Sequence, residues 1–270
     1  MGTEREILEA RLRDAIQKCE RGSVAILPFL DPRDSKICER LLRASGKWES
    51  AWLWGGHKEA ERKTLFLLPE YLTVCLSDLP TRCDEGEVLE LLGEEATEAV
   101  CALRITGSGF RVLSHRDYLG SVLALGIERG ALGDIAVQNE REAVLFCSST
   151  MSLFLREHLT RVAADGVKVT QYVPDDRFTD GKRYEHISDT VASDRLDCVV
   201  AALCNLSREN AQALIRNDAV DVDFEPVLRT DLTVSAPATL SIRGYGRFIL
   251  RSYDGETRKG RLRLRADKLV

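Results

Sequence analysis

The order of secondary structure predicted between residues 99 and 173 restricts the fold of this chain more than any other feature. Along this segment, stretches in which apolar residues recur at strand spacing take turns with stretches in which they recur at helical spacing. They predict a strand, a helix, two strands, a helix and a strand, at 99–105, 116–125, 134–138, 143–146, 151–163 and 167–173. Ser114 is placed to cap the first helix, and the polar hairpin 139–142 joins the middle strands. This βαββαβ order predicts a ferredoxin-like plait.

The plait is shared by RNA-binding domains and by proteins of many other functions, so the fold alone decides no function. Plaits that bind RNA stack bases on aromatic side chains of their two central strands. The corresponding strands of this chain offer only Phe146. The sequence therefore predicts a plait domain at 93–176 and leaves its RNA-binding surface open.

Residues 1–92 predict a smaller α+β domain in front of the plait. Thr3 and Glu6 form a capping-box pattern at the start of a helix that ends before Gly22. No element is predicted across Pro28 and Pro32. The other predicted elements are a helix at 35–44 and strands at 48–54, 65–68 and 72–76.

The composition is that of a water-soluble chain with two or three domains. The 270 residues are 44% hydrophobic and 30% charged, and no run approaches the roughly 18 apolar residues of a membrane span. The N-terminus lacks the apolar block of a signal peptide, which predicts a cytoplasmic location. The eight cysteines are scattered without metal-ligand spacing, so we expect reduced thiols, no metal and no cofactor.

Charge is distributed unevenly along the chain. From Arg243 to Val270 there are nine Lys or Arg and three acidic residues, a net charge of +6, whereas the preceding 242 residues carry −11. This polarity predicts that a polyanion binds near the carboxyl end.

A polar linker is predicted at 177–188, followed by a domain at 189–270 that begins with two short helices. Ser207 is placed to cap the second helix, and a turn at Asn217-Asp218 leads into the strand 220–222. Three arginines, Arg195, Arg208 and Arg216, are predicted to stay free and to line one exposed face. The side chains predicted to face inward are Leu196, Val199, Val200 and Leu203 in the first helix and Ala211, Leu214 and Ile215 in the second.

This segment resembles the S4 domain, an RNA-binding module of helices and strands. The resemblance rests on Arg195-Leu196-Asp197, Ser207-Arg208, Ala211, Leu214-Ile215, Val220, Val222 and the stretch from Ser241 to Phe248. The chain departs from the pattern at three turns, Asn217-Asp218, Asp223-Phe224 and Ala236-Pro237. The resemblance implies a C-terminal αα-plus-β domain that grips the phosphates of structured RNA with arginines.

The RNA-binding residues that follow from this resemblance and from the basic pattern of 258–265 are predicted as one set. Basic and apolar residues alternate from Arg261 onward, which predicts a strand with one buried face and an outward arginine ladder of a single sign. The set comprises Arg195, Ser207, Arg208, Gln212, Arg216, Arg243, Arg247, Arg258, Lys259, Arg261 and Arg263.

Motifs upstream resemble the bacterial YlmH family. They are Gly55-Gly56-His57-Lys58-Glu59-Ala60-Glu61-Arg62-Lys63, Leu68-Pro69, the run from Ser114 to Ser121, Leu125-Gly126-Ile127 and Gly133-Asp134-Ile135. The resemblance implies an N-terminal domain, a plait and an S4 domain. It also implies a non-catalytic, ribosome-associated role with rRNA or tRNA on the large subunit, in translation quality control.

Two other functions stay open at this point: an RNA-modifying enzyme that uses the S4 domain as a substrate handle, and an adaptor in cell division or photosynthetic assembly. His115-Arg116-Asp117 imitates a kinase loop but lacks the Asn expected five residues after the Asp. Arg195-Leu196-Asp197 imitates a pseudouridine synthase segment. The alternating acids Asp221, Asp223 and Glu225 are typical of turns. No small-molecule substrate is expected.

Overall fold

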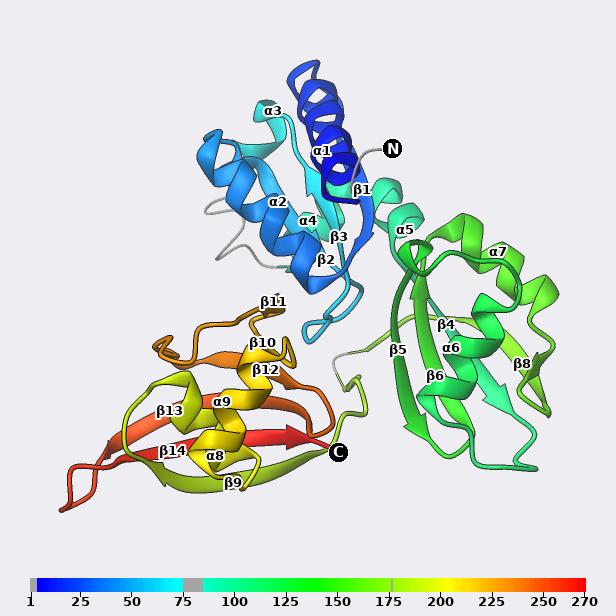
Figure 1. Cartoon of the computed structure of the whole chain (residues 1–270). Coiled ribbons are helices and arrows are strands. Elements are labelled where there is room, and N and C mark those ends of the chain that lie inside the picture. The colour runs from blue at the N-terminus through cyan, green and yellow to red at the C-terminus, as the bar shows by residue number, and fades with distance from the viewer. Residues whose placement is uncertain (1–3, 75–84, 176) are drawn as a thin grey trace. The chain divides into compact units, whose positions relative to one another are not determined.

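The computed structural model describes residues 4–74, 85–175 and 177–270 (Figure 1). The chain forms two compact units, residues 1–181 and 182–270. Both are α+β, as predicted. The first unit contains both of the predicted front domains and is not divided at residue 92. The predicted capping residue Thr3 lies outside the described residues.

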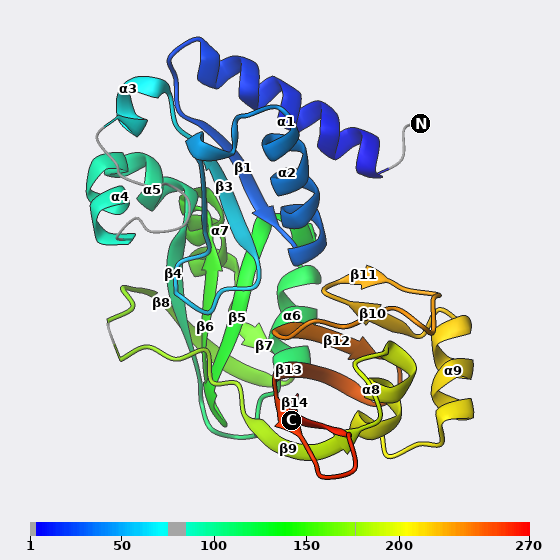
Figure 2. The same ribbon diagram turned by 90° about the vertical axis from the view of Figure 1, so that its left-hand side faces the viewer.

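A three-stranded antiparallel sheet, in the order β1-β3-β2, organises the first part of unit 1. Helices α1 and α2 cover one of its faces, where Leu12 and Leu42 pack against Leu27 and Leu65 (Figure 2). The elements are α1 Glu4–Glu20, β1 Ala25–Leu30, α2 Pro32–Ala44, a 3-10 turn Trp48–Ser50, β2 Ala51–Trp54, β3 Lys63–Leu67, α3 Glu70–Thr73, α4 Glu85–Leu92 and α5 Glu94–Ala99.

One strand of this part was not predicted, and one prediction is wrong. Strand β1, which was not predicted, runs through Pro28, because β1 is an edge strand and its pairing shifts register between Leu27 and Leu30. The strand predicted at 72–76 is contradicted by α3, and residues 75 and 76 lie outside the described residues. The predicted strand 48–54 begins only at Ala51.

The plait is confirmed. Its sheet has the order β5-β6-β4-β8, with a short strand β7 beyond β8, and every pairing is antiparallel. The second helix is shorter than predicted, since residues 161–162 already form β7. The elements are β4 Cys101–Gly107, α6 His115–Leu123, a 3-10 turn Arg129–Ala131, β5 Leu132–Asn139, β6 Glu142–Cys147, α7 Ser149–His158, β7 Arg161–Val162 and β8 Asp165–Tyr172.

The two parts of unit 1 share a hydrophobic core. Alternate residues of β3 face opposite ways, so that Leu65 packs under α1 and α2 while Phe66 points to the plait. Phe66 and Trp52 pack with Val144 and Phe146 of β6 and with side chains of α4 and α5. Helices α6 and α7 pack on the opposite face of the plait sheet. The face of the plait that would stack RNA bases is therefore closed at Phe146, which is 1% exposed.

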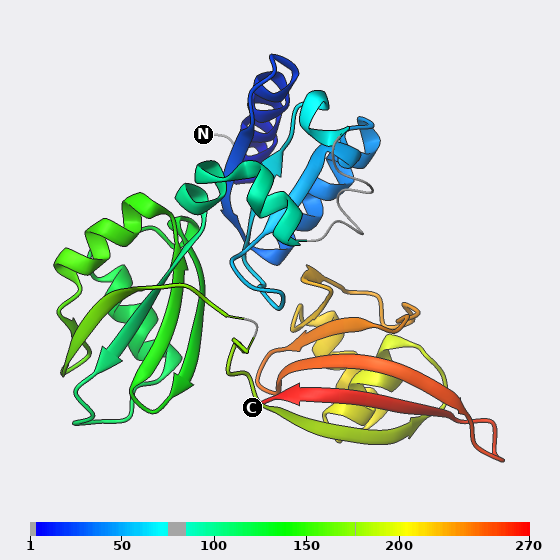
Figure 3. The same ribbon diagram turned by 180° about the vertical axis from the view of Figure 1, so that it is seen from behind.

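Unit 2 is a six-stranded antiparallel sheet with two helices on one face (Figure 3). The strand order is β11-β10-β12-β13-β14-β9. Its elements are β9 Tyr184–Val191, α8 Leu196–Leu203, α9 Arg208–Arg216, β10 Val220–Val222, β11 Glu225–Pro226, β12 Ala238–Ile242, β13 Gly246–Glu256 and β14 Leu262–Leu269. Residues 184–188 of the predicted linker belong to β9, which pairs with β14 along its whole length. The linker prediction is wrong for those residues.

Candidate nucleic-acid interface

The helix pair α8–α9 forms as the sequence predicts. Leu196, Val199 and Val200 are fully buried against the sheet, as are Ala211 and Ile215 of α9. The Ser207 hydroxyl caps α9 by accepting from the backbone N–H of Asn210 at 3.2 Å.

The start of α8 is anchored by the segment before β12. The backbone N–H groups of Leu196 and Asp197, which have no partner within the helix, donate to the carbonyls of Leu232 and Thr230 at 2.8 and 3.1 Å. Both helix starts are therefore held in place.

Asp197 organises the polar side chains of the helix pair. Its side chain is fully buried, and its carboxylate accepts two bonds from Arg195 at 3.2 Å, one from Arg208 Nε at 2.9 Å and one from Gln212 Nε2 at 2.7 Å. Burial alone would raise the pKa of Asp197, but these hydrogen bonds and the two positive charges lower it well below the ordinary value. Asp197 is therefore ionised and holds two side chains of α9, Arg208 and Gln212, together with that of Arg195, the N-cap residue of α8.

This arrangement corrects the prediction that Arg195 and Arg208 are free. Both are paired with Asp197, although their side chains remain 39% and 53% exposed. A guanidinium group has five N–H donors, and these two spend only two and one of them on Asp197. One carboxylate for two arginines leaves the cluster with net positive charge. Sequence reasoning missed Asp197, although it stands in the Arg195-Leu196-Asp197 motif.

Two more predicted residues lie at the far end of α9. Arg216 is exposed in its last turn. Arg243, in the turn between β12 and β13, donates to the carbonyl of Asp218 at 3.1 Å, just beyond the end of α9.

The basic residues around β13 and β14 do not form the predicted ladder of a single sign. Leu264 and Ala266 are buried and Arg263 and Arg265 exposed, which confirms the alternation. Acids share this outer face, however, because Arg265 pairs with Asp254 and Arg251 pairs with Asp267 at 2.6 Å.

Two other predicted side chains of this region make local contacts, and two are exposed. Arg261 donates to Thr190, and Arg247 lies over the Phe224 ring at 5.4 Å. Arg258 and Lys259 are exposed in the β13–β14 hairpin. Arg247 is the second residue of the 11-residue strand β13, and Arg258 lies two residues beyond its end, so that about 35 Å of extended chain separates them. The structure therefore divides the predicted set into a helix group and a hairpin group.

The upstream motifs join the two parts of unit 1. The Asp134 carboxylate accepts the backbone N–H groups of Glu61 and Arg62 at 2.7 and 3.2 Å, and His57 lies 3.6 Å from it. Arg62 donates in turn to the carbonyls of Leu132 and Phe29. These residues fasten the β2–β3 connection to β5 and have a structural explanation.

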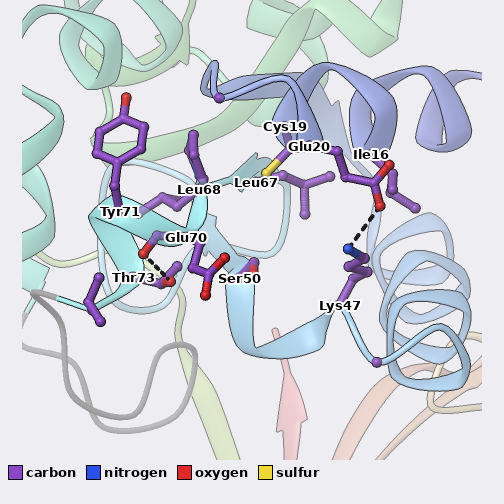
Figure 4. Close-up of a pocket in the computed structure, with 14 residues that line it drawn as sticks. Ile16, Cys19, Glu20, Lys47, Ser50, Leu67, Leu68, Glu70, Tyr71 and Thr73 are labelled. Atoms are coloured by element: carbon purple, nitrogen blue, oxygen red, sulfur yellow. Dashed lines mark hydrogen bonds and ion pairs between the residues drawn. The ribbon is translucent and has the colours of Figure 1, made fainter.

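A pocket of about 770 Å³ lies between the ends of α1 and α2 and the segment around α3 (Figure 4). It holds no activated nucleophile. Lys47 is paired with Glu20 at 2.8 Å, which raises the pKa of the ammonium group. Burial raises the pKa of the Cys19 thiol. Neither group is poised for covalent catalysis.

Within the described ranges, no cluster of three His, Cys, Asp or Glu side chains could hold a metal ion. None of the described helices combines the length and apolar character needed to cross a bilayer.

Asp223, one of the alternating acids, accepts the backbone N–H of Thr239 at 2.9 Å, as expected of a turn residue.

A plait fastened to an N-terminal α+β part, with a separate unit that displays arginines on a helix pair, is a combination expected of an RNA-binding protein. Comparison with known proteins agrees. A family model described as "Putative RNA-binding domain in YlmH" matches residues 100–175. The chain is 30% identical over 246 residues to the ribosome-associated protein quality control protein P2 of Bacillus subtilis (strain 168), covering 91% of this chain and 87% of that protein. The chain belongs to the YlmH family.

A solved structure, the cell division protein ylmH from Streptococcus pneumoniae, is a more distant match. It is 18% identical with a TM-score of 0.47, covering 64% of this chain and 93% of the other.

Proposed function

We propose that this protein is a non-catalytic RNA-binding factor of the large ribosomal subunit, which grips rRNA or tRNA with an S4-type unit, residues 182–270, in translation quality control. The observation that carries the proposal is the arginine array that Asp197 organises on α8 and α9. Asp197 holds Arg195 and Arg208 in position while their side chains stay partly exposed and keep unused donors, and guanidinium groups held in this way suit the spaced phosphates of folded RNA.

Family membership supports the ribosomal partner, since the matched relative is named a ribosome-associated quality control protein. The described residues hold no metal cluster, and the pocket beside α3 holds no activated nucleophile, which favours a binding role over the enzymatic alternative. The helix group is the primary contact: Arg195, Ser207, Arg208, Gln212, Arg216 and Arg243. The hairpin group contributes Arg258, Lys259, Arg261 and Arg263 at the other end of β13, whereas Arg247 lies at the end of β13 that adjoins Arg243.

The test uses arginines whose loss leaves the Asp197 network intact. Arg216→Glu with Arg243→Glu should weaken retention of purified large subunits or tRNA at least tenfold in a filter-binding assay. Each lost phosphate contact should also lower the dependence of log K on log salt concentration by nearly one. The charge-matched control is Arg13→Glu with Lys18→Glu, on the exposed face of α1. Equal retention by the two double variants would refute the proposal.

A further inference from the structure

The plait needs a different RNA-binding surface from the usual one. In unit 1 the aromatic side chain of a central strand, Phe146, is covered by the rings of His57 and Phe178, with centroids 4.8 and 5.7 Å away. A base cannot stack there without unpacking the shared core of the unit. Any base contact made by this domain must therefore lie elsewhere on it.

The loop between β4 and α6 presents an aromatic side chain to solvent. Phe110 is 83% exposed, more than any other large apolar side chain in the described part of the chain, and Val112 beside it is 62% exposed. Neighbouring apolar side chains that are exposed together, rather than singly, are a feature of interaction sites.

This loop is anchored at both ends. Gly107 and Leu113 donate their backbone N–H groups to the carbonyls of Arg141 and Glu140, both at 2.7 Å, and so tie the loop to the β5–β6 hairpin at the same end of the sheet (Figure 1). The buried Asp165 accepts from the Ser108 hydroxyl, which also accepts the N–H of Phe110 at 3.2 Å. The backbone at Phe110 is therefore held in place, which reduces the entropy that the loop loses when a ligand binds.

Arginines stand on both sides of Phe110. Arg111 is 43% exposed and 3.6 Å from Asp117, and the exposed Arg141 comes from the hairpin, its guanidinium group next to the backbone of Gly109. The acids at this end are Asp117, which accepts from Ser114 and thereby completes the cap of α6, the exposed Glu140 and the buried Asp165. Arg116 adds a third positive charge, so that three arginines stand against three acids, one of which is buried.

We propose that the Phe110 loop, residues 108–113 with the hairpin tip 140–141, binds unpaired RNA. Phe110 stacks on a base while Arg111 and Arg141 contact the flanking phosphates. This inference rests on the proposed function and adds a second RNA site to it. A base beside a phosphate matches an aromatic ring flanked by arginines. A stable protein partner would need about 800 Å² of complementary surface, more than this one loop offers. The family model named for RNA binding spans both segments.

The test uses full-length protein and a fluorescent 12-nucleotide polyuridine, which cannot form structure. Phe110→Ala should weaken binding about five- to tenfold, within the range for loss of one stacked base. Phe110→Trp should restore it. The matched control is Leu153→Ala, which removes an exposed apolar side chain from α7 on the same domain. Ultraviolet crosslinks should map to the peptide that contains Phe110.

The outcomes separate this inference from the proposed function. If polyuridine binds Phe110→Ala as tightly as wild type, while Arg216→Glu with Arg243→Glu still loses large subunits, the inference is wrong and the proposed function stands. If Phe110→Ala instead releases a protein partner with polyuridine binding unchanged, the inference is also wrong. If neither set of variants loses any RNA, both are wrong.

Discussion

The Nε atom of Arg208 lies 2.9 Å from the Oδ2 atom of Asp197 and thereby ties α9 to α8 through a carboxylate that is fully buried. Such a bond has two consequences. It fixes the arginine where a ligand can meet it, and it makes the helix pair dependent on one ionised group.

Replacing Asp197 by Ala should lower the free energy of unfolding of unit 2 by about 3 kcal/mol, because two arginines and Gln212 lose their common acceptor at once. Denaturant unfolding of the full chain, followed by hydrogen exchange of the α8 and α9 amides, measures this loss. Glu209→Ala removes an exposed acid from α9 and should change stability by less than about 0.5 kcal/mol. A loss below about 1 kcal/mol for Asp197→Ala would contradict the assigned role.

The same carboxylate should make unit 2 sensitive to acid. The folded pKa of Asp197 is depressed, so its contribution to stability is complete above the ordinary aspartate pKa of about 4 and is lost as pH falls below that value toward the folded pKa. The protection of the α8 and α9 amides against exchange, relative to unprotected amides at the same pH, should therefore fall below about pH 4. Asp197→Asn, which cannot titrate, should show a flatter dependence. Parallel pH curves for the two proteins would rule this out.

Gly56 should be intolerant of any side chain. Its φ is +96°, and a Cβ atom there would lie 2.3 Å from Cδ1 of Phe146 in the shared core. Gly56→Ala should destabilise unit 1 by about 2 kcal/mol or more, measured by thermal unfolding. Gly120→Ala supplies the contrast, since Gly120 lies within α6 with open space around it. That variant should gain up to about 1 kcal/mol of helix stability, and equal behaviour of the two would contradict the packing described.

The cysteines Cys101 and Cys147, paired across β4 and β6, should differ sharply in reactivity. The hydrogen bond with Cys147 lowers the pKa of Cys101 to about 7, whereas that same bond and burial raise the pKa of Cys147. The rate at which iodoacetamide alkylates Cys101 should thus rise with pH, with its midpoint near pH 7, because only the thiolate reacts. Peptide mass spectrometry identifies the labelled residue. Cys147→Ala should move the midpoint upward, and an unmoved midpoint would exclude the coupling.

The fold was predictable where a local pattern and tertiary packing agree. The plait strands are apolar enough to be recognised because both faces of β6 are buried, with Leu145 under the helices and Phe146 under the N-terminal part. The pair α8–α9 was predictable because its apolar spacing and the cap at Ser207 coincide.

Elements that depend on distant partners were not predictable. Strand β9 is mostly polar and reads as a linker, yet it is a strand because all eight of its residues pair with β14, more than 70 positions away. The arrangement of the candidate site was not predictable for the same reason. Arg195 and Arg208 were identified from the motif, but only the three-dimensional structure brings both to one buried carboxylate.

Pro28 has a consequence for how copies of this protein behave when concentrated. An edge strand with a regular row of donors and acceptors is a template for further strands, and that is a common route to aggregation. In β1 the missing N–H of Pro28 and the shift in register between Leu27 and Leu30 interrupt that row. The N-terminal sheet is thereby kept from growing from one molecule into the next.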